Sequence, residues 1–290
     1  AASPDSQDSS SQEQNSDSST DSSASQESAA ASQEEGTLSP SSGSSTFTDN
    51  SDSSMDNVLS QVQSLLPTDN GTWSVYVCNL AKNTEGAIND QKMQAASLIK
   101  LYIMGAVYED YDSLSTTYGK ETLDNNLNSM ITVSDNESFN ELVRLQTTSG
   151  VFKDGAEAVN AFLAESQFAD TSVQHTLSPS ASKDAGLGGR NTTSVKDCGE
   201  LLFRIYKGEC VSKEASEAML NLLLNQQVTT KIPSGISASV EIANKTGETD
   251  TDQHDIAIVY GEKTTYILCV MSENCKSGDA VSHIRDISGI

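Results

Sequence analysis

The sequence predicts an α+β fold, in which an antiparallel sheet is flanked by helices and preceded by a disordered leader. Three observations support this prediction. The first 54 residues are poor in apolar side chains. A β-rich run near residue 72 is then followed by several segments whose apolar residues recur at helical spacing. Three strand-like runs succeed one another between residues 237 and 272, and we expect the early strand to join them, so that both chain ends close one sheet.

Residues 1–54 form the expected leader, because they consist mostly of Ser, Asp, Gln, Glu and Ala. Eleven of the 41 acidic residues precede residue 57, whereas the first basic residue anywhere is Lys82. So little apolar surface cannot offset the conformational entropy lost on folding. Residues 55–290 are numerous enough to bury a full hydrophobic core, and we expect them to form one domain.

Composition also restricts the partners. The net charge of −24 argues against nucleic acid and anionic membranes, since both are polyanions. The five cysteines contain no CxxC pair and no Cys/His spacing of a zinc site, so we expect no metal. A Ser/Asp-rich leader suits a spacer at a cell surface, so an extracellular or cell-surface monomer is the expectation. A solubilising tail without a specific role is the alternative.

The elements can be placed along the chain from their apolar patterns. Helices are expected at 55–66, 94–109, 137–146, 155–165, 194–207 and 212–226. Strands are expected at 72–80, 237–247, 254–262 and 264–272. A turn is expected at 83–86 and a polar, flexible loop at 167–193.

The helix at 94–109 is apolar nearly all round, which predicts burial on every side, yet it carries Ser97 and Lys100. Residues three apart share one helix face, so a hydroxyl and an ammonium would lie side by side in apolar surroundings. Burial disfavours the charged amine and lowers its pKa, which suits a base that activates the serine. A serine that bonds a carbonyl and a lysine that reaches solvent are the structural alternative.

Two further polar motifs follow in the chain. Ser134, Asp135 and Asn136 stand at the edge of a buried-looking segment, and Lys245-Thr246-Gly247 lies in a strand-like run. Each motif alone is common, and a turn, a cap or a solvated strand charge would explain it. The ordered set, with each motif in a matching context, indicates a serine acyl-transfer site.

The three motifs in this order resemble the penicillin-recognising serine hydrolases, specifically the class A β-lactamases. The flanking segments AASLIKLYIM, MITVSDNESFNELV, NTTSVKD and KTGETDTDQHDIAIV are also similar to that family. The resemblance covers roughly residues 70–285. It implies a β-lactamase/transpeptidase-like fold with an all-helical lobe beside the sheet, in a catalytic domain spanning 55–290, and it implies no cofactor.

The resemblance also implies roles for individual residues. Ser97 is the expected nucleophile and Lys100 its base, and Ser134 is expected to pass a proton to the leaving nitrogen. Binding of the substrate is expected from Asn136, Lys245, Thr246, Gly247 and the backbone N–H of Glu248.

One family feature is missing from the sequence. Class A β-lactamases carry a loop glutamate that activates the deacylating water, but the loop at 167–193 contains no glutamate. Its only carboxylates are Asp170 and Asp184, and the nearest glutamates are Glu165 and Glu200. Loss of an activating base typically costs about 10²–10⁴ in rate, so we expect slow deacylation.

Three functions are therefore compatible with the sequence. The first is a β-lactam hydrolase that is acylated at Ser97 and turns over slowly. The second is a D-Ala-D-Ala carboxypeptidase or penicillin-binding protein that acts on peptidoglycan peptides. The third is a surface sensor module without turnover, which the complete Ser/Lys/Ser/Lys set disfavours.

Overall fold

The computed structural model describes residues 52–178 and 186–290. The leader predicted for residues 1–54 thus lies outside the described residues, apart from its last three positions. Helix α1 (Ser53–Leu65) begins two residues before the predicted start of the domain. Its N-cap Asp52 accepts a hydrogen bond from the Met55 N–H at 2.8 Å, which fixes where the helix starts.

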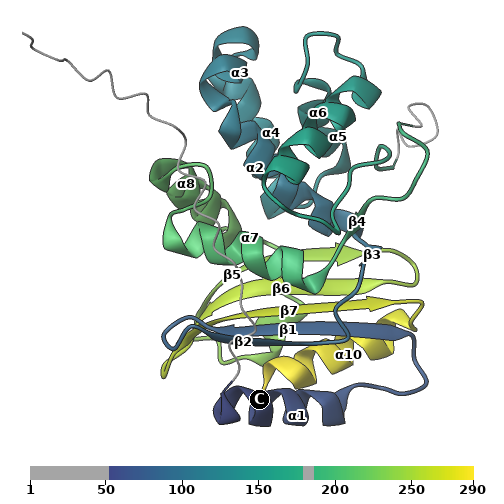
Figure 1. Cartoon of the computed structure of the whole chain (residues 1–290), viewed down its shortest axis with the longest axis vertical. Helices are drawn as coiled ribbons and strands as arrows, with labels where there is room; N and C mark the ends of the chain where they lie inside the picture. Colours follow the sequence, from purple (N-terminus) through teal and green to yellow (C-terminus); the bar gives the residue numbers. More distant parts are fainter. Residues whose placement is uncertain (1–51, 179–185) are drawn as a thin grey trace, which may run out of the picture. The chain divides into compact units, whose positions relative to one another are not determined.

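A five-stranded sheet in the order β2-β1-β7-β6-β5 lies at the centre, and every pairing is antiparallel. Its strands are β1 (Thr72–Asn79), β2 (Thr84–Ile88), β5 (Glu241–Glu248), β6 (Gln253–Tyr260) and β7 (Thr265–Glu273). The early β1 pairs with the late β7 along its whole length (Figure 1). The predicted α+β fold, with one sheet closed by both ends of the chain, is confirmed.

One face of the sheet is covered by α7 (Val195–Lys207), which contacts β1, β6 and β7, and α8 (Lys213–Leu224) lies against β5. The helical lobe continues on this side of the sheet (Figure 1). It consists of α2 (Ile99–Glu109), α3 (Tyr111–Tyr118), α4 (Lys120–Thr132), α5 (Asn136–Arg144) and α6 (Phe152–Glu165). Helix α2 contacts all four of the others, and its residues 99–107 are all buried, as its apolar sequence predicts.

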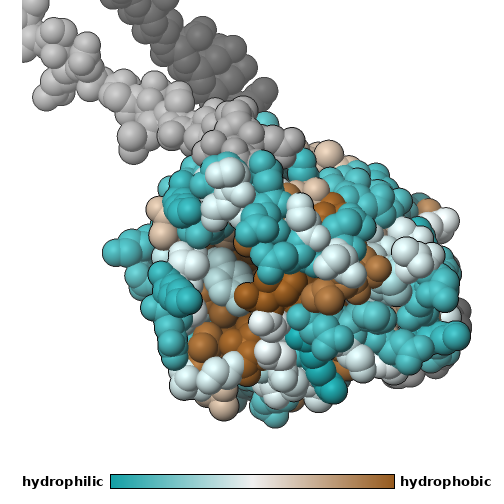
Figure 2. Space-filling view, turned by 90° about the horizontal axis from the view of Figure 1, so that it is seen from below, coloured by the Kyte–Doolittle hydropathy of each residue, from teal (hydrophilic) through white to brown (hydrophobic). Residues whose placement is uncertain are grey.

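The opposite face of the sheet carries α1 and α10 (Ser277–Ser288), with the short α9 (Ile232–Gly235) packed against α10. A second apolar core fills this side, and Figure 2, seen from the same side, shows apolar side chains gathered in the middle of the face. A hollow of about 410 Å³ opens there between α1, the sheet and the end of α10. Among the described residues, no helix is both long and apolar enough to cross a membrane.

Several predicted boundaries differ from the structure. The turn expected at 83–86 is wrong, because the chain reverses just before it and residues 84–88 form the edge strand β2. The predicted helix at 94–109 begins later, after the short strand β3 (Met93–Gln94) and a 3₁₀ turn, η1 (Ala96–Leu98). The strand expected from 237 starts at Glu241. The polar loop ends in the short strand β4 (Thr192–Thr193), which pairs with β3.

Candidate active site

The turn that carries Ser97 leads directly into α2. Ala96 has a positive φ of 45°, a conformation that costs a residue with a side chain free energy and persists only where the surroundings enforce it. Burial of Ala96 and Leu98 provides that constraint, whereas Ser97 between them is partly exposed. The turn is closed by a hydrogen bond from the Leu98 N–H to the Ala95 carbonyl at 3.0 Å, which places Ser97 between its two ends.

Lys100 lies one turn further along α2 and is fully buried. Its Nζ donates to Ser97 Oγ at 2.9 Å, to Ser134 Oγ at 3.1 Å, to the Ser134 carbonyl at 2.6 Å and to Asn136 Oδ1 at 2.7 Å. Burial lowers the pKa of Lys100 to about 7, and the nearby Asp135 carboxylate opposes that shift only in part. Lys100 is therefore held against the candidate nucleophile and can lose its proton near neutral pH.

Ser134 lies between α4 and α5 with a positive φ of 60°. The next residue, Asp135, is the N-cap of α5 and accepts a hydrogen bond from the Ser138 N–H at 2.7 Å. This cap fixes the chain so that Ser134 Oγ receives hydrogen bonds from both Lys100 Nζ and Lys245 Nζ. One hydroxyl thus connects two amines that come from distant parts of the sequence.

Lys245 lies on β5, the edge strand of the sheet, and is fully buried. Its Nζ donates to Ser134 Oγ at 2.9 Å and to the Thr246 carbonyl at 2.7 Å. Burial is the main cause that lowers the pKa of Lys245, and the charge of Lys100 adds to it. The Thr246 hydroxyl forms no hydrogen bond within the described part of the chain, so it can bind a ligand.

Gly247 brings β5 close to the turn that carries Ser97. A Cβ at this position would lie 3.2 Å from the Ala95 carbonyl oxygen, from Leu98 Cγ and from His254 Cδ2. All three neighbours belong to buried residues, so a side chain here would push the strand and the turn apart. The absence of a side chain at Gly247 therefore allows β5 and the turn that carries Ser97 to lie in direct contact.

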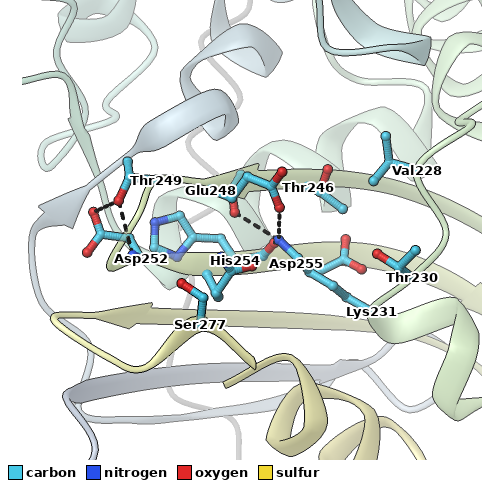
Figure 3. Close-up of polar contacts among 12 residues, drawn as sticks. Val228, Thr230, Lys231, Thr246, Glu248, Thr249, Asp252, His254, Asp255 and Ser277 are labelled. Carbon is cyan, nitrogen blue, oxygen red and sulfur yellow. Dashed lines mark hydrogen bonds and ion pairs between the residues drawn. The ribbon is translucent and has the colours of Figure 1, made fainter. Parts of the chain in front are cut away.

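Lys231, just before α9, is a buried lysine that the sequence analysis missed. Its Nζ donates to the carbonyls of Gly247 and His254, both at 3.1 Å, and forms an ion pair with Glu248 Oε2 at 3.2 Å (Figure 3). Burial lowers the pKa of Lys231, while the carboxyls of Asp255 and Glu248 oppose the shift. No motif spacing surrounds this lysine in the sequence, since only the tertiary fold brings it to β5.

Three asparagines bind the backbone of the polar loop after α6. Asn140 on α5 binds both the N–H of Leu177 (2.8 Å) and its carbonyl (2.9 Å). Asn160 binds the Val173 N–H and carbonyl, both at 2.8 Å. Asn191 Oδ1 accepts hydrogen bonds from the N–H groups of the two residues that follow Val173. These two-point contacts place the loop next to α5, the helix that begins at Asn136.

The described loop offers no carboxylate to the site. Asp170 instead forms an ion pair with Lys92 at 3.8 Å, and Asp184 lies outside the described residues. Within the described part of the chain, the hydrogen bonds of Lys100 reach two serines and an asparagine and no carboxylate. The missing loop glutamate is therefore not replaced by a described acidic side chain that contacts Lys100.

The structure brings most of the predicted residues together. Hydrogen bonds link five of them directly: Ser97, Lys100, Ser134, Asn136 and Lys245. Thr246 and Gly247 follow on the same strand, and the side chain of Glu248 pairs with Lys231. His254 on β6 is buried, with Nε2 2.9 Å from the Gln94 carbonyl oxygen and Nδ1 accepting from the Ser272 N–H.

A family model described as Beta-lactamase enzyme family matches residues 57–119 and 113–290. No curated protein sequence matches the chain. Solved structures do match. PBP-A aligns with a TM-score of 0.68 at 22% identity, over 80% of this chain and 93% of that one.

Two other solved structures are similar to a comparable degree. A β-lactamase from Sphaerobacter thermophilus DSM 20745 has a TM-score of 0.66 at 20% identity, over 80% of this chain and 94% of its own. An ancestral (GNCA) class A β-lactamase has a TM-score of 0.66 at 18% identity, over 80% and 97%. At these identities, the likeness to solved structures establishes the fold.

Proposed function

The chain belongs to the Beta-lactamase enzyme family, and on that premise we propose that it is an active-site-serine hydrolase acylated at Ser97 by β-lactams. One observation supports this proposal above all others. Ser97 Oγ and Ser134 Oγ both accept hydrogen bonds from Lys100 Nζ, and Ser134 Oγ also accepts one from Lys245 Nζ. Such a chain of proton-carrying groups is what acyl transfer by a serine requires.

In the proposed acylation step, neutral Lys100 takes the proton of the Ser97 hydroxyl, 2.9 Å away. Ser97 Oγ then forms a bond to the carbonyl carbon of the lactam. The negative charge on the carbonyl oxygen is stabilised by the backbone N–H groups of Ser97 and Glu248, as the family resemblance implies. When the carbonyl re-forms, the C–N bond breaks and Ser134 passes a proton to the leaving nitrogen.

Deacylation is proposed to be slow. A water molecule must attack the ester carbonyl, and a base has to take its proton. In the described loop, the residue that Asn140 holds at its N–H and carbonyl is Leu177, which has no basic group. Lys100 is the remaining candidate base, so we expect the acyl-enzyme to accumulate during turnover.

A D-Ala-D-Ala carboxypeptidase or penicillin-binding protein is the second candidate. The specific observation that favours it is that the hydrogen bonds of Lys100 reach no described carboxylate, because a site without a base for the water can acylate without hydrolysing penicillin efficiently. One structural neighbour, with a TM-score of 0.69 at 22% identity, is an acyl-enzyme complex of a PBP-A mutant with penicillin G.

The experiment is intact-mass measurement of the chain after mixing with benzylpenicillin, followed over time. We expect an adduct on the wild-type chain and none on Ser97→Ala. Release of hydrolysed penicillin within minutes favours the β-lactamase. A persistent adduct, together with cleavage of a D-Ala-D-Ala peptide, favours the carboxypeptidase. Absence of any adduct would contradict both and leave the sensor module.

A further inference from the structure

Lys231 differs from the other two buried lysines in its surroundings. Lys100 and Lys245 both donate to Ser134 Oγ, whereas Lys231 Nζ is surrounded by two backbone carbonyls and the carboxylate of Glu248. Only 1% of the Lys231 side chain is exposed, but 64% of the Glu248 side chain is. Glu248 is thus an exposed side chain paired with a buried cation.

The position of this pair on β5 connects it to the active site. Thr246 and Glu248 are two residues apart on the strand, so their side chains leave the same face. Gly247 between them contributes its carbonyl to Lys231 and contacts the Ser97 turn. Figure 3 shows Thr246 and Glu248 side by side next to Lys231. A ligand bound at Thr246 would therefore lie beside the Lys231–Glu248 pair.

The other carboxyl group near Lys231 is already engaged. Asp255 on β6 accepts hydrogen bonds from the Ile232 N–H at 2.9 Å and from Asn244 Nδ2 at 3.0 Å. Burial raises the pKa of Asp255 to about 7, so its negative charge is reduced near neutral pH. Glu248 is the exposed carboxylate of the two, and it forms the ion pair with Lys231 Nζ at 3.2 Å.

We propose that the Glu248 carboxylate occupies the place of a substrate carboxylate, so that an anionic acyl donor has to displace it from Lys231. This inference rests on the proposed acylation of Ser97. Thr246 Oγ, free of hydrogen bonds to described residues, is the second group that would bind the incoming carboxylate. The Glu248 side chain is 64% exposed and is readily hydrated when it leaves, whereas Lys231 is 1% exposed. A buried cation without a partner is costly, so another anion has to take the place of Glu248, and a substrate carboxylate can do so.

This arrangement makes Glu248 a specificity-determining residue. An acyl donor that carries a carboxylate competes with Glu248 and is repelled by it, but a donor without that charge meets neither effect. Removal of the Glu248 charge should therefore favour anionic donors over neutral donors. This increased preference for anionic donors should depend on Lys231, because Lys231 is the cation that loses its partner when the Glu248 charge is removed.

The test compares Glu248→Gln with the wild type, using benzylpenicillin and its neutral methyl ester as acyl donors. The measured quantity is the second-order rate constant for acylation of Ser97, taken as the ratio of anionic to neutral donor. We expect this ratio to rise about three- to tenfold at low salt and to approach the wild-type value at high salt. Glu241→Gln, an exposed charge change at the other end of β5, should leave the ratio unchanged.

A double variant then tests the dependence on the cation. In Lys231→Met, addition of Glu248→Gln should no longer raise the ratio. An unchanged or lower ratio in Glu248→Gln alone would overturn the inference while leaving acylation of Ser97 intact. If Glu248→Gln still raises the ratio of anionic to neutral donor in the Lys231→Met background, the inference is also overturned. If neither compound acylates the wild-type chain, the proposed function and this inference fail together.

Discussion

At the scale of single residues, two buried lysines share one hydroxyl. Lys100 Nζ and Lys245 Nζ both lie within hydrogen-bond distance of Ser134 Oγ. Burial is the main cause that lowers the pKa of each lysine, and the charge of Lys100 lowers the pKa of Lys245 further. Burial of Lys100 thus makes a neutral amine available as a base.

The pH dependence of acylation follows from the lowered pKa of Lys100. Below a pKa of about 7 the amine is protonated and cannot accept the Ser97 proton; above that pKa it is neutral and can. The acylation rate with benzylpenicillin should therefore rise with pH around a midpoint near 7, and at pH 5 it should be about 100-fold below the plateau. Spontaneous hydrolysis of the penicillin at each pH is the control. A rate that does not change between pH 5 and 9 would exclude Lys100 as the base.

The position of Leu177 leads to a prediction about the rate of deacylation. The Asn140 side chain binds the backbone N–H and carbonyl of Leu177. Asn140 lies one helical turn after Asn136, which accepts a hydrogen bond from Lys100. The variant Leu177→Glu places a carboxylate in the loop where the resemblance to class A β-lactamases implies a water-activating base. We expect the acyl adduct to decay at least about 10²-fold faster, as measured by intact mass after removal of free penicillin.

Leu187→Glu is the matched control for that experiment, because Leu187 is another partly buried leucine of the same loop. It should leave the lifetime of the adduct unchanged. Equal adduct lifetimes in Leu177→Glu and the wild type would show that this part of the loop does not face the acyl group.

At the scale of elements, the site forms where the edge of the sheet meets the start of α2. Strand β5 stands last in the order of the described strands, and the turn that carries Ser97 contacts it. Gly247 permits this approach, since a Cβ would lie 3.2 Å from three atoms of buried residues. The distance between an edge strand and a helix start therefore depends on one glycine.

Gly247→Ala tests this contact. The added methyl group should displace the Ser97 turn from β5 by a few tenths of an ångström and lower the acylation rate at least about tenfold. The loss of stability should be about 1–3 kcal/mol, measured by thermal or urea unfolding. Gly278→Ala is the control, because a Cβ at this position of α10 meets no atom within 4 Å. Full activity in Gly247→Ala would contradict the close approach.

The elements that the sequence could not predict share a physical cause. Strand β2 has only five residues, and its sequence TEGAI contains the polar residues and glycine that are typical of turns. Helix α10 is weakly apolar, and its buried face consists mainly of Ala280, Ile284 and Ile287, which contribute to the second core. Both elements depend on packing against the sheet, so local sequence carries little information about them.

At the scale of the whole molecule, the fold assembles a site from three distant segments. The sheet joins β1 to β7, and the helical lobe inserted between them carries Ser97 and Ser134 to the edge strand with Lys245. The motifs predicted these residues because each lies in a local context typical of the family. Lys231 escaped prediction, because its importance arises only from contacts with β5 and β6.

The location of the acyl group tests most directly whether Ser97 is the nucleophile of the proposed active site. The wild-type chain is treated with benzylpenicillin, quenched in acid, digested and mapped by tandem mass spectrometry. We expect one penicilloyl group, attached to Ser97 by an ester bond. Attachment to any other residue, or an adduct that persists in Ser97→Ala, would contradict the convergence of Ser97, Lys100, Ser134 and Lys245 on one catalytic centre.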